Sequence, residues 1–439
     1  MAKRSAPAVE GEPRFDRLVL RNARCFRDAV IELDPQLTVL IGENGAGKTT
    51  VVEALASLTY GNEEGLPSFP LSREATTGDI ALYESSRASR PAARWRSGAT
   101  ATAARRLPPN RYLLAYGRYR RVFFPREART EASSVSPAQD LGQLASRANS
   151  SRTATLFRPD NHLLRDLSRY LVALHYASQS DPRLATVWQR LDDSLRQLGQ
   201  GIEGIEMARG KTGYIPRVMR NGVALELSEL SDGYQAVLVI VFDLILRYIF
   251  LFSSLDDPLL GSAMVAIDEV DLHLHPRWQR TVAVQLTTLF PKTQFVLTTH
   301  SPAVVQGAID QERRIVSLRD ESGNAMARTL APGETKQLVG AEIGSLLLEE
   351  KLFGVDSRYS PRFSKVEERV SDMQEKVASG EASKQDVKGL FRDLGTLQKL
   401  VAADEVRRAD GPFLSQLAEL RGAFLKDLAT QIEKTRGDA

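Results

Sequence analysis

The chain has 439 residues, and its 42% hydrophobic and 26% charged residues are the proportions of a globular protein with room for about three domains. Its single cysteine, Cys25, excludes an intrachain disulfide, and the first fifteen residues lack the apolar core of a secretory signal, so we expect a cytoplasmic protein. The net charge of +3 conceals a local excess, because residues 86–130 hold twelve arginines and one acidic residue.

A phosphate-binding loop is predicted near the N-terminus. Residues 37–41 form a short apolar run, and residues 42–50 read GENGAGKTT directly after it. A strand that runs into G-x-x-x-x-G-K-S/T predicts backbone N–H groups around phosphate, with Lys48 on the β- and γ-phosphates and Thr49 on Mg²⁺. A glycine-rich turn with a chance lysine is the alternative, but the flanking strand and helix formers favour ATP. The predicted ATP contacts are Gly42, Glu43, Asn44, Gly45, Ala46, Gly47, Lys48, Thr49 and Thr50.

An arginine-rich insert is expected at about residues 80–135, followed by a helical lobe at about residues 140–210. Arginines engage backbone phosphates and aromatic rings stack on unpaired bases, so the insert predicts contact with DNA. The alternative is a solvated lobe, or arginines that face ATP and a dimer partner. No sustained heptads occur here, which argues against a long coiled-coil arm. The aromatic residues of the insert are Trp95, Tyr112, Tyr116, Tyr119, Phe123 and Phe124.

The segment LSDGYQ, residues 230–235, places Ser231 and Gly233 where a loop meets a helix, and such a junction favours anions. The apolar run that follows, residues 236–252, is short for a membrane span and contains Asp243 and Arg247. We therefore expect a helix buried in a protein core, and no membrane segment.

Two further strands are predicted to end in polar residues. Residues 264–267 are apolar and lead into Asp268 and Glu269, which predicts a metal-binding acid followed by a general base for the attacking water. Residues 294–302 read QFVLTTHSP, and His300 in this segment is predicted to contact the γ-phosphate. A zinc site formed by His273, His275 and His300 is the weaker alternative, because no cysteine accompanies them.

The order of these motifs, GENGAGKTT, LSDGYQ, AIDEVDLHLHP and TTHSP, resembles the ABC-type ATPase heads of the RecF/SMC/OLD superfamily over about residues 15–318. The resemblance implies an α/β P-loop NTPase fold of ABC-ATPase type, with a mixed sheet flanked by helices, a helical lobe and a C-terminal helical extension. It also implies a head-to-head dimer in which Ser231 and Gly233 contact the γ-phosphate held by Lys48 of the partner, with Asp271 in the D-loop. The resemblance also implies a Q-loop glutamine after the strand at residues 111–116, where the sequence has Gly117 and Arg118, and we assign neither Gln139 nor Gln143 further on to that role.

Beyond the head, three amphipathic helices are predicted within residues 363–432, and no nuclease constellation is present in the sequence. This tail and residues 344–359 resemble the ATPases of Septu-type antiphage systems and their retron-associated relatives, which implies a separate HNH-type nuclease partner. We therefore expect a flexible segment at 1–13, an ATPase head at 14–330 and a partner-binding region at 331–439. A RecF-like DNA-repair ATPase without a nuclease partner is the alternative function, and a scaffold without DNA contact is a further one.

Overall fold

The computed structural model describes most of the head and little of the tail. The chain forms two compact units, Met1–Gly354 and Val355–Ala439. The first thirteen residues, much of the arginine-rich segment and the three predicted C-terminal helices, apart from five isolated positions, lie outside the described residues. The described ranges are 14–58, 71–72, 75–84, 91–97, 102–105, 107, 111–118, 167–197, 201–209, 214–230, 232–341, 343–349 and 352–353.

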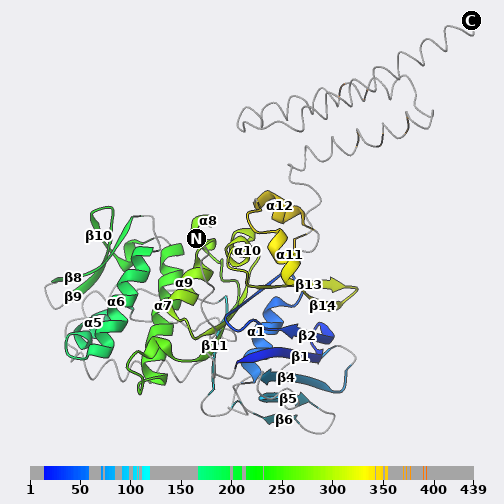
Figure 1. Ribbon diagram of the computed structural model, residues 1–439, viewed down its shortest axis with the longest axis horizontal. Coiled ribbons are helices and arrows are strands. Elements are labelled where there is room, and N and C mark those ends of the chain that lie inside the picture. Colours follow the sequence, from blue (N-terminus) through cyan, green and yellow to red (C-terminus); the bar gives the residue numbers. More distant parts are fainter. Residues whose placement is uncertain are drawn as a thin grey trace, which may run out of the picture. The chain divides into compact units, whose positions relative to one another are not determined.

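A six-stranded sheet in the order β14-β13-β3-β12-β11-β7 forms the centre of the first unit (Figure 1). Five of its strands are parallel, and β14 pairs antiparallel with β13 at one edge. Because parallel strands end at the same edge of a sheet, residues that follow several strands are brought together there. The strands are β3 (Leu37–Gly42), β7 (Tyr112–Tyr116), β11 (Ala263–Ile267), β12 (Gln294–Thr298), β13 (Arg314–Glu321) and β14 (Asn324–Thr329).

Helix α1 (Lys48–Ser57) and a five-stranded antiparallel sheet cover one face of the central sheet. Side chains alternate along each strand, so Leu40 packs on this side while Val39 and Ile41 point to the other. The antiparallel sheet has the order β2-β1-β4-β5-β6. Its strands are β1 (Phe15–Ala23), β2 (Phe26–Glu32), β4 (Gly78–Glu84), β5 (Ala93–Ser97) and β6 (Thr102–Arg105).

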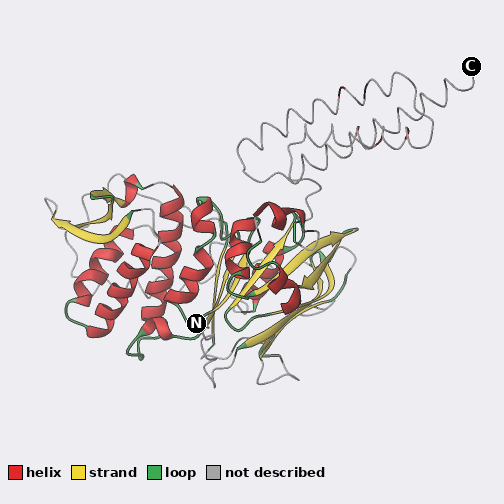
Figure 2. Ribbon diagram, turned by 45° about the horizontal axis from the view of Figure 1, so that its top comes forward, coloured by secondary structure: helices red, strands yellow, loops and turns green. Residues whose placement is uncertain are grey.

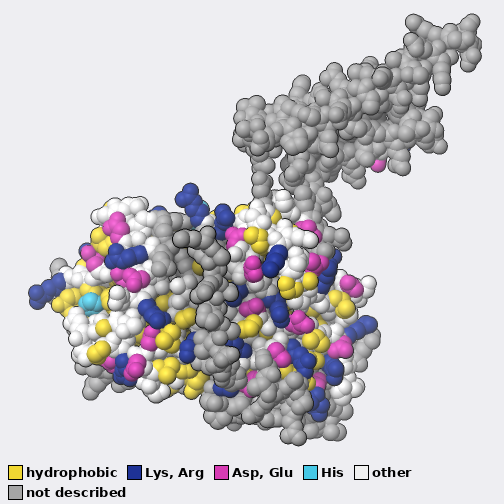
Figure 3. All heavy atoms as spheres, in the orientation of Figure 1, with side chains coloured by type: hydrophobic (Ala, Val, Ile, Leu, Met, Phe, Trp, Pro, Cys, Tyr) yellow, Lys and Arg dark blue, Asp and Glu magenta, His cyan; other side chains and the backbone are white. Residues whose placement is uncertain are grey.

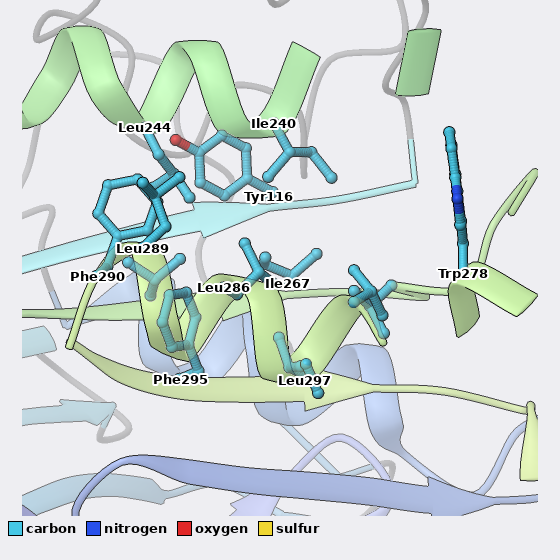
Figure 4. Close-up of a cluster of buried hydrophobic side chains, with 14 of the residues drawn as sticks. Tyr116, Ile240, Leu244, Ile267, Trp278, Leu286, Leu289, Phe290, Phe295 and Leu297 are labelled. Carbon is cyan, nitrogen blue, oxygen red and sulfur yellow. The ribbon is translucent and has the colours of Figure 1, made fainter. Parts of the chain in front are cut away.

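Helices cover the opposite face and continue into the helical lobe (Figure 2). Their apolar side chains join those of β7, β11 and β12 in one core, part of which is drawn in Figure 4. The lobe also contains a three-stranded antiparallel sheet that the sequence reading missed. The elements on this side are α5 (Leu167–Ser178), α6 (Pro182–Gln197), β8 (Ile202–Arg209), β9 (Tyr214–Arg220), β10 (Val223–Glu226), α7 (Asp232–Leu251), α8 (Pro276–Gln279), α9 (Val282–Leu289) and α10 (Pro302–Ile309). Two 3₁₀ turns, Leu227–Glu229 and Pro258–Leu260, precede α7 and β11.

Helix α7 is the core helix predicted from the apolar run. By length and composition it would suit a membrane span, but 69% of its most apolar window is buried inside the protein. Asp243 and Arg247, the two charged residues within it, are both buried and paired with each other. Packing against the sheet therefore accounts for its hydrophobicity.

The described part of the arginine-rich segment belongs to two sheets, because β5 and β6 extend the antiparallel sheet while β7 lies in the central sheet. Arg94 and Arg96 lie near Asp79 on the neighbouring strand, and Arg111 donates to Glu84 at 2.8 Å. Trp95 and Tyr116 are buried, so their predicted role in base stacking is wrong. Basic and acidic side chains of the described residues are interspersed on the face shown in Figure 3.

The first unit extends past the head boundary expected at residue 330. Helices α11 (Pro332–Gln337) and α12 (Ile343–Leu348) follow β14, and Gln306 of α10 donates to the carbonyl of Ala341 at 2.7 Å. Leu346 and Leu352 are buried in the main core. The sequence motifs gave no indication of these contacts, and the first unit ends at Gly354.

One buried side chain joins the beginning of β12 to the N-terminal strands. The amide nitrogen of Gln294 donates to the carbonyl of Phe15 at 2.6 Å and to that of Asp34 at 2.8 Å. Its amide oxygen accepts from the backbone N–H of Phe15 at 3.1 Å. Gln294 thus satisfies three main-chain groups where two sheets meet.

Candidate nucleotide site

The phosphate-binding loop lies between β3 and α1, as predicted. Gly47, directly before α1, has φ 98°, and a Cβ at this position would lie 2.7 Å from the ring of Phe26 and 2.9 Å from Sγ of Cys25. Only glycine fits both the left-handed backbone and this close approach. The buried Nζ of Lys48 donates to the carbonyls of Gly42 at 2.7 Å and Glu43 at 2.8 Å. The ammonium is therefore held inside the curl of the loop.

The residues predicted to contact ATP differ in exposure along the loop. Glu43, Asn44 and Gly45 are exposed, whereas Ala46 is buried and Thr50 lies beneath the first turn of α1. The exposed segment is thus the part of the loop open to a ligand.

Asp268 directly follows β11 and is almost fully buried. Its Oδ2 accepts from the hydroxyl of Thr49 at 2.9 Å, and its Oδ1 accepts from the hydroxyl of Thr298 at 2.7 Å. Its backbone N–H donates to the carbonyl of Tyr116 at 2.7 Å. A hydroxyl and a carboxylate oxygen side by side are the hard donors that Mg²⁺ prefers, so Thr49 and Asp268 fit the predicted metal.

Glu269 makes a sharp turn after Asp268. Its φ of 48° is left-handed, which is uncommon for a side chain other than glycine, asparagine or aspartate. Its backbone N–H donates to the hydroxyl of Thr298 at 2.7 Å, and the N–H of Val270 donates to the carbonyl of Thr298 at 2.9 Å. These bonds to β12 hold the unusual conformation, which is the kind of strain found at functional sites.

His300 and Asp271 lie near the same edge of the sheet. His300 follows β12, two residues after the strand ends. Partial burial and the nearby charge of Lys48 lower the pKa of its imidazole, against the opposite effects of Asp271, Glu269 and Asp268. Asp271 accepts from the hydroxyl of Thr299 at 2.6 Å. The structure therefore brings one lysine, one histidine and three carboxylates together around the loop.

Burial lowers the pKa of Lys48, and the carboxylates of Asp268, Glu269, Asp271 and Glu43 oppose that shift in this order. The surplus of negative charge is what a site needs if it is to hold a divalent cation as well as an anionic phosphate chain.

The second predicted anion site is described only in part. Ser231 lies outside the described residues, and Gly233 lies in the first turn of α7. A Cβ on Gly233 would come within 2.4 Å of the carbonyl oxygen of His273, a residue with φ 65°. The glycine thus has a packing role inside the chain in addition to the predicted contact with a partner's ATP. His275, of the zinc alternative, caps α8 by accepting from the N–H of Arg277 at 3.3 Å.

Sequence reasoning missed three residues of this site. Thr298 fixes both acids, Thr299 holds Asp271, and Tyr116 holds the backbone of Asp268. The two threonines directly precede His300 at the end of a predicted strand, which is a usable signal. The sequence contains no such signal for Tyr116, because the role of this residue depends on the pairing of β7 with β11.

This fold and site define a P-loop ATPase of the ABC type. Residues 37–306 match the family described as "AAA domain, putative AbiEii toxin, Type IV TA system", which is more than half of the chain, so the protein belongs to this family.

Individual relatives are similar over different parts of the chain. The Septu protein PtuA of Bacillus mycoides is 24% identical over 404 residues, 89% of this chain and 52% of its own length. The Retron Ec83 probable ATPase of Escherichia coli is 34% identical over 37% of this chain and 28% of its own length. The Retron Vc95 probable ATPase of Vibrio cholerae is 33% identical over 32% of this chain and 27% of its own length. The alignments therefore span about half or less of these relatives.

Among solved structures, an SMC head bound to the C-terminal winged-helix domain of ScpA covers 73% of this chain and 98% of its own, with a TM-score of 0.44 at 13% identity. The SMC head domain from Thermotoga maritima covers 72% and 99%, with a TM-score of 0.38 at 15% identity.

Proposed function

We propose that this chain is the ATP-hydrolysing regulatory subunit of an antiphage defence complex. The observation that carries the chemistry is the meeting of Lys48, Thr49, Asp268, Glu269 and His300 at the ends of β3, β11 and β12. The defence setting is supported by the similarity to Septu and retron ATPases.

ATP binding would exchange contacts that the loop now makes with itself. The ammonium of Lys48 would leave the carbonyls of Gly42 and Glu43 for the β- and γ-phosphates, while backbone N–H groups of the loop contact the same oxygens. Thr49 and Asp268 would hold Mg²⁺, which supplies charge neutralisation of the phosphates when bound.

We place the nucleoside end of ATP in a pocket beside the loop. A cavity of about 890 Å³ is lined mostly by residues in and around the β1–β2 turn and by the segment before β4. It reaches the loop through Cys25, whose Sγ lies 3.9 Å from the hydroxyl of Thr50. Arg24, which pairs with the buried Glu53 of α1, also lines it and would face the base or ribose. The other lining residues are Asn22, Arg27, Leu71, Ser72, Ala75, Thr76, Thr77 and Gly323.

Hydrolysis would use Glu269 as the general base. Its carboxylate would take a proton from water as the water oxygen bonds to the γ-phosphorus and the bond from that phosphorus to the bridging oxygen breaks, giving ADP and phosphate. His300 would donate to the γ-phosphate from the side of Lys48. Sandwiching by a second head would add Ser231 and Gly233 of the partner to the same γ-phosphate.

Two substitutions test the ATP site. Lys48→Ala should lose ATP binding, because the phosphates lose their main cation. Glu269→Gln should bind ATP with unchanged affinity, hydrolyse it ~10²–10⁴-fold more slowly and accumulate an ATP-bound dimer, because only the proton acceptor has changed. Equilibrium binding, phosphate release and light scattering measure these three quantities. Normal turnover in the Glu269→Gln protein would refute the assignment.

We further propose that DNA is a ligand of Arg118, Arg120 and Arg121. Arg118 is exposed directly after β7, whereas Arg120 and Arg121 lie outside the described residues. Replacing these three arginines by glutamate should weaken DNA binding and flatten its salt dependence, by about one unit of slope for each phosphate that an arginine no longer neutralises. If ATPase activity collapses while the DNA affinity stays the same, the arginines serve the ATP site instead.

The regulated effector would be a separate HNH-type nuclease, and we expect no nuclease activity from this chain itself. The complex would act in the cytoplasm. A RecF-like repair ATPase remains the second candidate, favoured by a 36% identical match over 78 residues to RecF of Mesorhizobium japonicum. Native mass spectrometry of the complex purified from its host separates the two, since only the first function requires a nuclease subunit.

A further inference from the structure

Helix α7 contains a buried ion pair that ATP chemistry does not use. Asp243 and Arg247 are 1% and 3% exposed, and Nε of Arg247 lies 2.5 Å from Oδ2 of Asp243. Replacing such a pair by apolar residues of similar volume often leaves stability unchanged or improves it, because burying two charges is costly. Stability is therefore a weak reason for a pair in the middle of an apolar helix.

Tyr116 connects this pair to the central sheet. Its hydroxyl donates to the same Oδ2 of Asp243 at 2.7 Å, and the guanidinium of Arg247 lies 5.9 Å from its ring centroid. Burial raises the pKa of the Tyr116 phenol well above its ordinary value, so the hydroxyl stays protonated and able to donate. Figure 4 shows the ring between β7 and α7.

The same residue reaches the ATP site through its main chain. The carbonyl of Tyr116 accepts the N–H of Asp268 at 2.7 Å, and Oδ2 of Asp268 is bonded to Thr49 of the phosphate-binding loop. Tyr116 thus contacts α7 with its side chain and the proposed Mg²⁺ ligand with its backbone. It contacts no part of the proposed ATP site with its side chain in the interactions described.

The N-terminal turn of α7 meets the segment that follows Asp268 at a second point. Gly233 approaches the carbonyl of His273, and the ring of Tyr234 packs edge-on against Trp278 with centroids 4.0 Å apart. A displacement at Asp268 can therefore reach α7 both at its middle and at the turn beside Ser231.

We propose that Tyr116, Asp243 and Arg247 form a positioning unit that moves α7 in step with Asp268 when ATP binds. The unit sets where the N-terminus of α7 is presented to a second copy of this chain. Tyr116 is a positioning residue in this account, because it acts through Asp268 and α7. The inference rests on the proposed function, since ATP at the loop supplies the displacement.

Tyr248 provides a matched control for a test of this unit. It lies on α7, is fully buried like Tyr116, and its hydroxyl is hydrogen-bonded to Thr293 instead of Asp243. Tyr116→Phe and Tyr248→Phe each remove one buried, bonded hydroxyl with little change in shape. Both are expected to lower the unfolding temperature, but only the first removes the hydrogen bond that links Asp268, through Tyr116, to the middle of α7, and the contact of Gly233 with His273 stays in both variants.

Hydrogen exchange with and without a non-hydrolysable ATP analogue and Mg²⁺ measures the coupling. The analogue should protect the loop at residues 42–50 in the wild type and in both variants. It should also change exchange in the middle turns of α7, around Asp243, in the wild type and Tyr248→Phe, and this change should be lost in Tyr116→Phe. The kcat of Tyr116→Phe should fall about tenfold, which corresponds to about 1.4 kcal/mol in activation free energy. Its KM should stay within about twofold of the wild-type value.

Equal α7 responses in the two variants would overturn the inference while the protected loop upholds the ATP site. If the loop of the wild type gains no protection, the proposed function fails and the inference fails with it. Should Tyr116→Phe not fold, the combined variant Tyr116→Phe, Asp243→Leu and Arg247→Met removes all three polar groups together. It should show the same loss of the α7 response, and a normal response in that variant would also overturn the proposal.

Discussion

At the scale of single residues, Thr298 organises the acidic side of the site. Its one hydroxyl donates to Asp268 and accepts the backbone N–H of Glu269, so it fixes the proposed metal ligand and the turn that carries the proposed general base. Because both bonds use the same oxygen, the positions of the two acids are not independent of each other.

His300 should couple ATP binding to proton uptake. Partial burial and Lys48 lower the pKa of its imidazole, so the ring is neutral at neutral pH in the free protein. A triphosphate beside it favours the imidazolium and raises the pKa. Between the two pKa values, binding therefore takes up a proton, and ATP affinity should rise as the pH falls through this range.

Titration calorimetry in buffers of different ionisation enthalpy measures that proton uptake. His300→Gln keeps a hydrogen-bonding side chain but cannot titrate, so the dependence on buffer should disappear. If the variant takes up as many protons as the wild type, another group is responsible.

At the scale of elements, the junction of α7 with the segment after β11 depends on Gly233. A Cβ there would lie 2.4 Å from a main-chain oxygen of His273, so Gly233→Ala must displace one of the two segments. We expect the free energy of unfolding without ATP to fall by about 1–3 kcal/mol. Gly333→Ala is the control, because it also lies in the first turn of a helix, α11, and has no atom within 4 Å of the added Cβ.

Denaturant unfolding of both alanine variants gives the comparison, with Gly333→Ala expected within about 0.5 kcal/mol of the wild type or slightly more stable. Equal stabilities would mean that the contact with His273 relaxes freely. Only the proposed contact with ATP bound to the partner would then require glycine at this position.

Individual strands could be predicted from the sequence, but contacts between elements could not. Three strands of the central sheet, β3, β11 and β12, were predicted from the sequence. Each is a short apolar run that leads directly into a motif of its own. The placement of the arginines was not predicted, because Arg94 pairs with Asp79 only through the register of β4 with β5. Tyr116 was misread for the same reason, since its burial depends on a helix more than a hundred residues away in the chain.

At the scale of the whole molecule, the chain after Gly354 should hold the effector. Truncation after Asp356 keeps Leu346 and Leu352 in the core, so we expect a soluble protein that binds ATP but no longer captures the nuclease subunit. Truncation after Leu330 removes both leucines and should aggregate, because it exposes the apolar surface beneath α12.

Copurification of each form with the nuclease, beside size-exclusion chromatography, separates these outcomes. A soluble Asp356 truncation that still retains the nuclease would place the partner surface on the first unit instead.

The amide of Gln294 is a place where chemical change would damage the fold. Its nitrogen donates to two carbonyl oxygens in a buried position, so deamidation to glutamate would turn two attractive contacts into oxygen–oxygen repulsion. Tight burial keeps water from the amide while the protein is folded, but each local opening exposes it. Ageing of the protein would then be irreversible at the seam between its two sheets, and the unfolding temperature of Gln294→Glu gives the size of that damage directly.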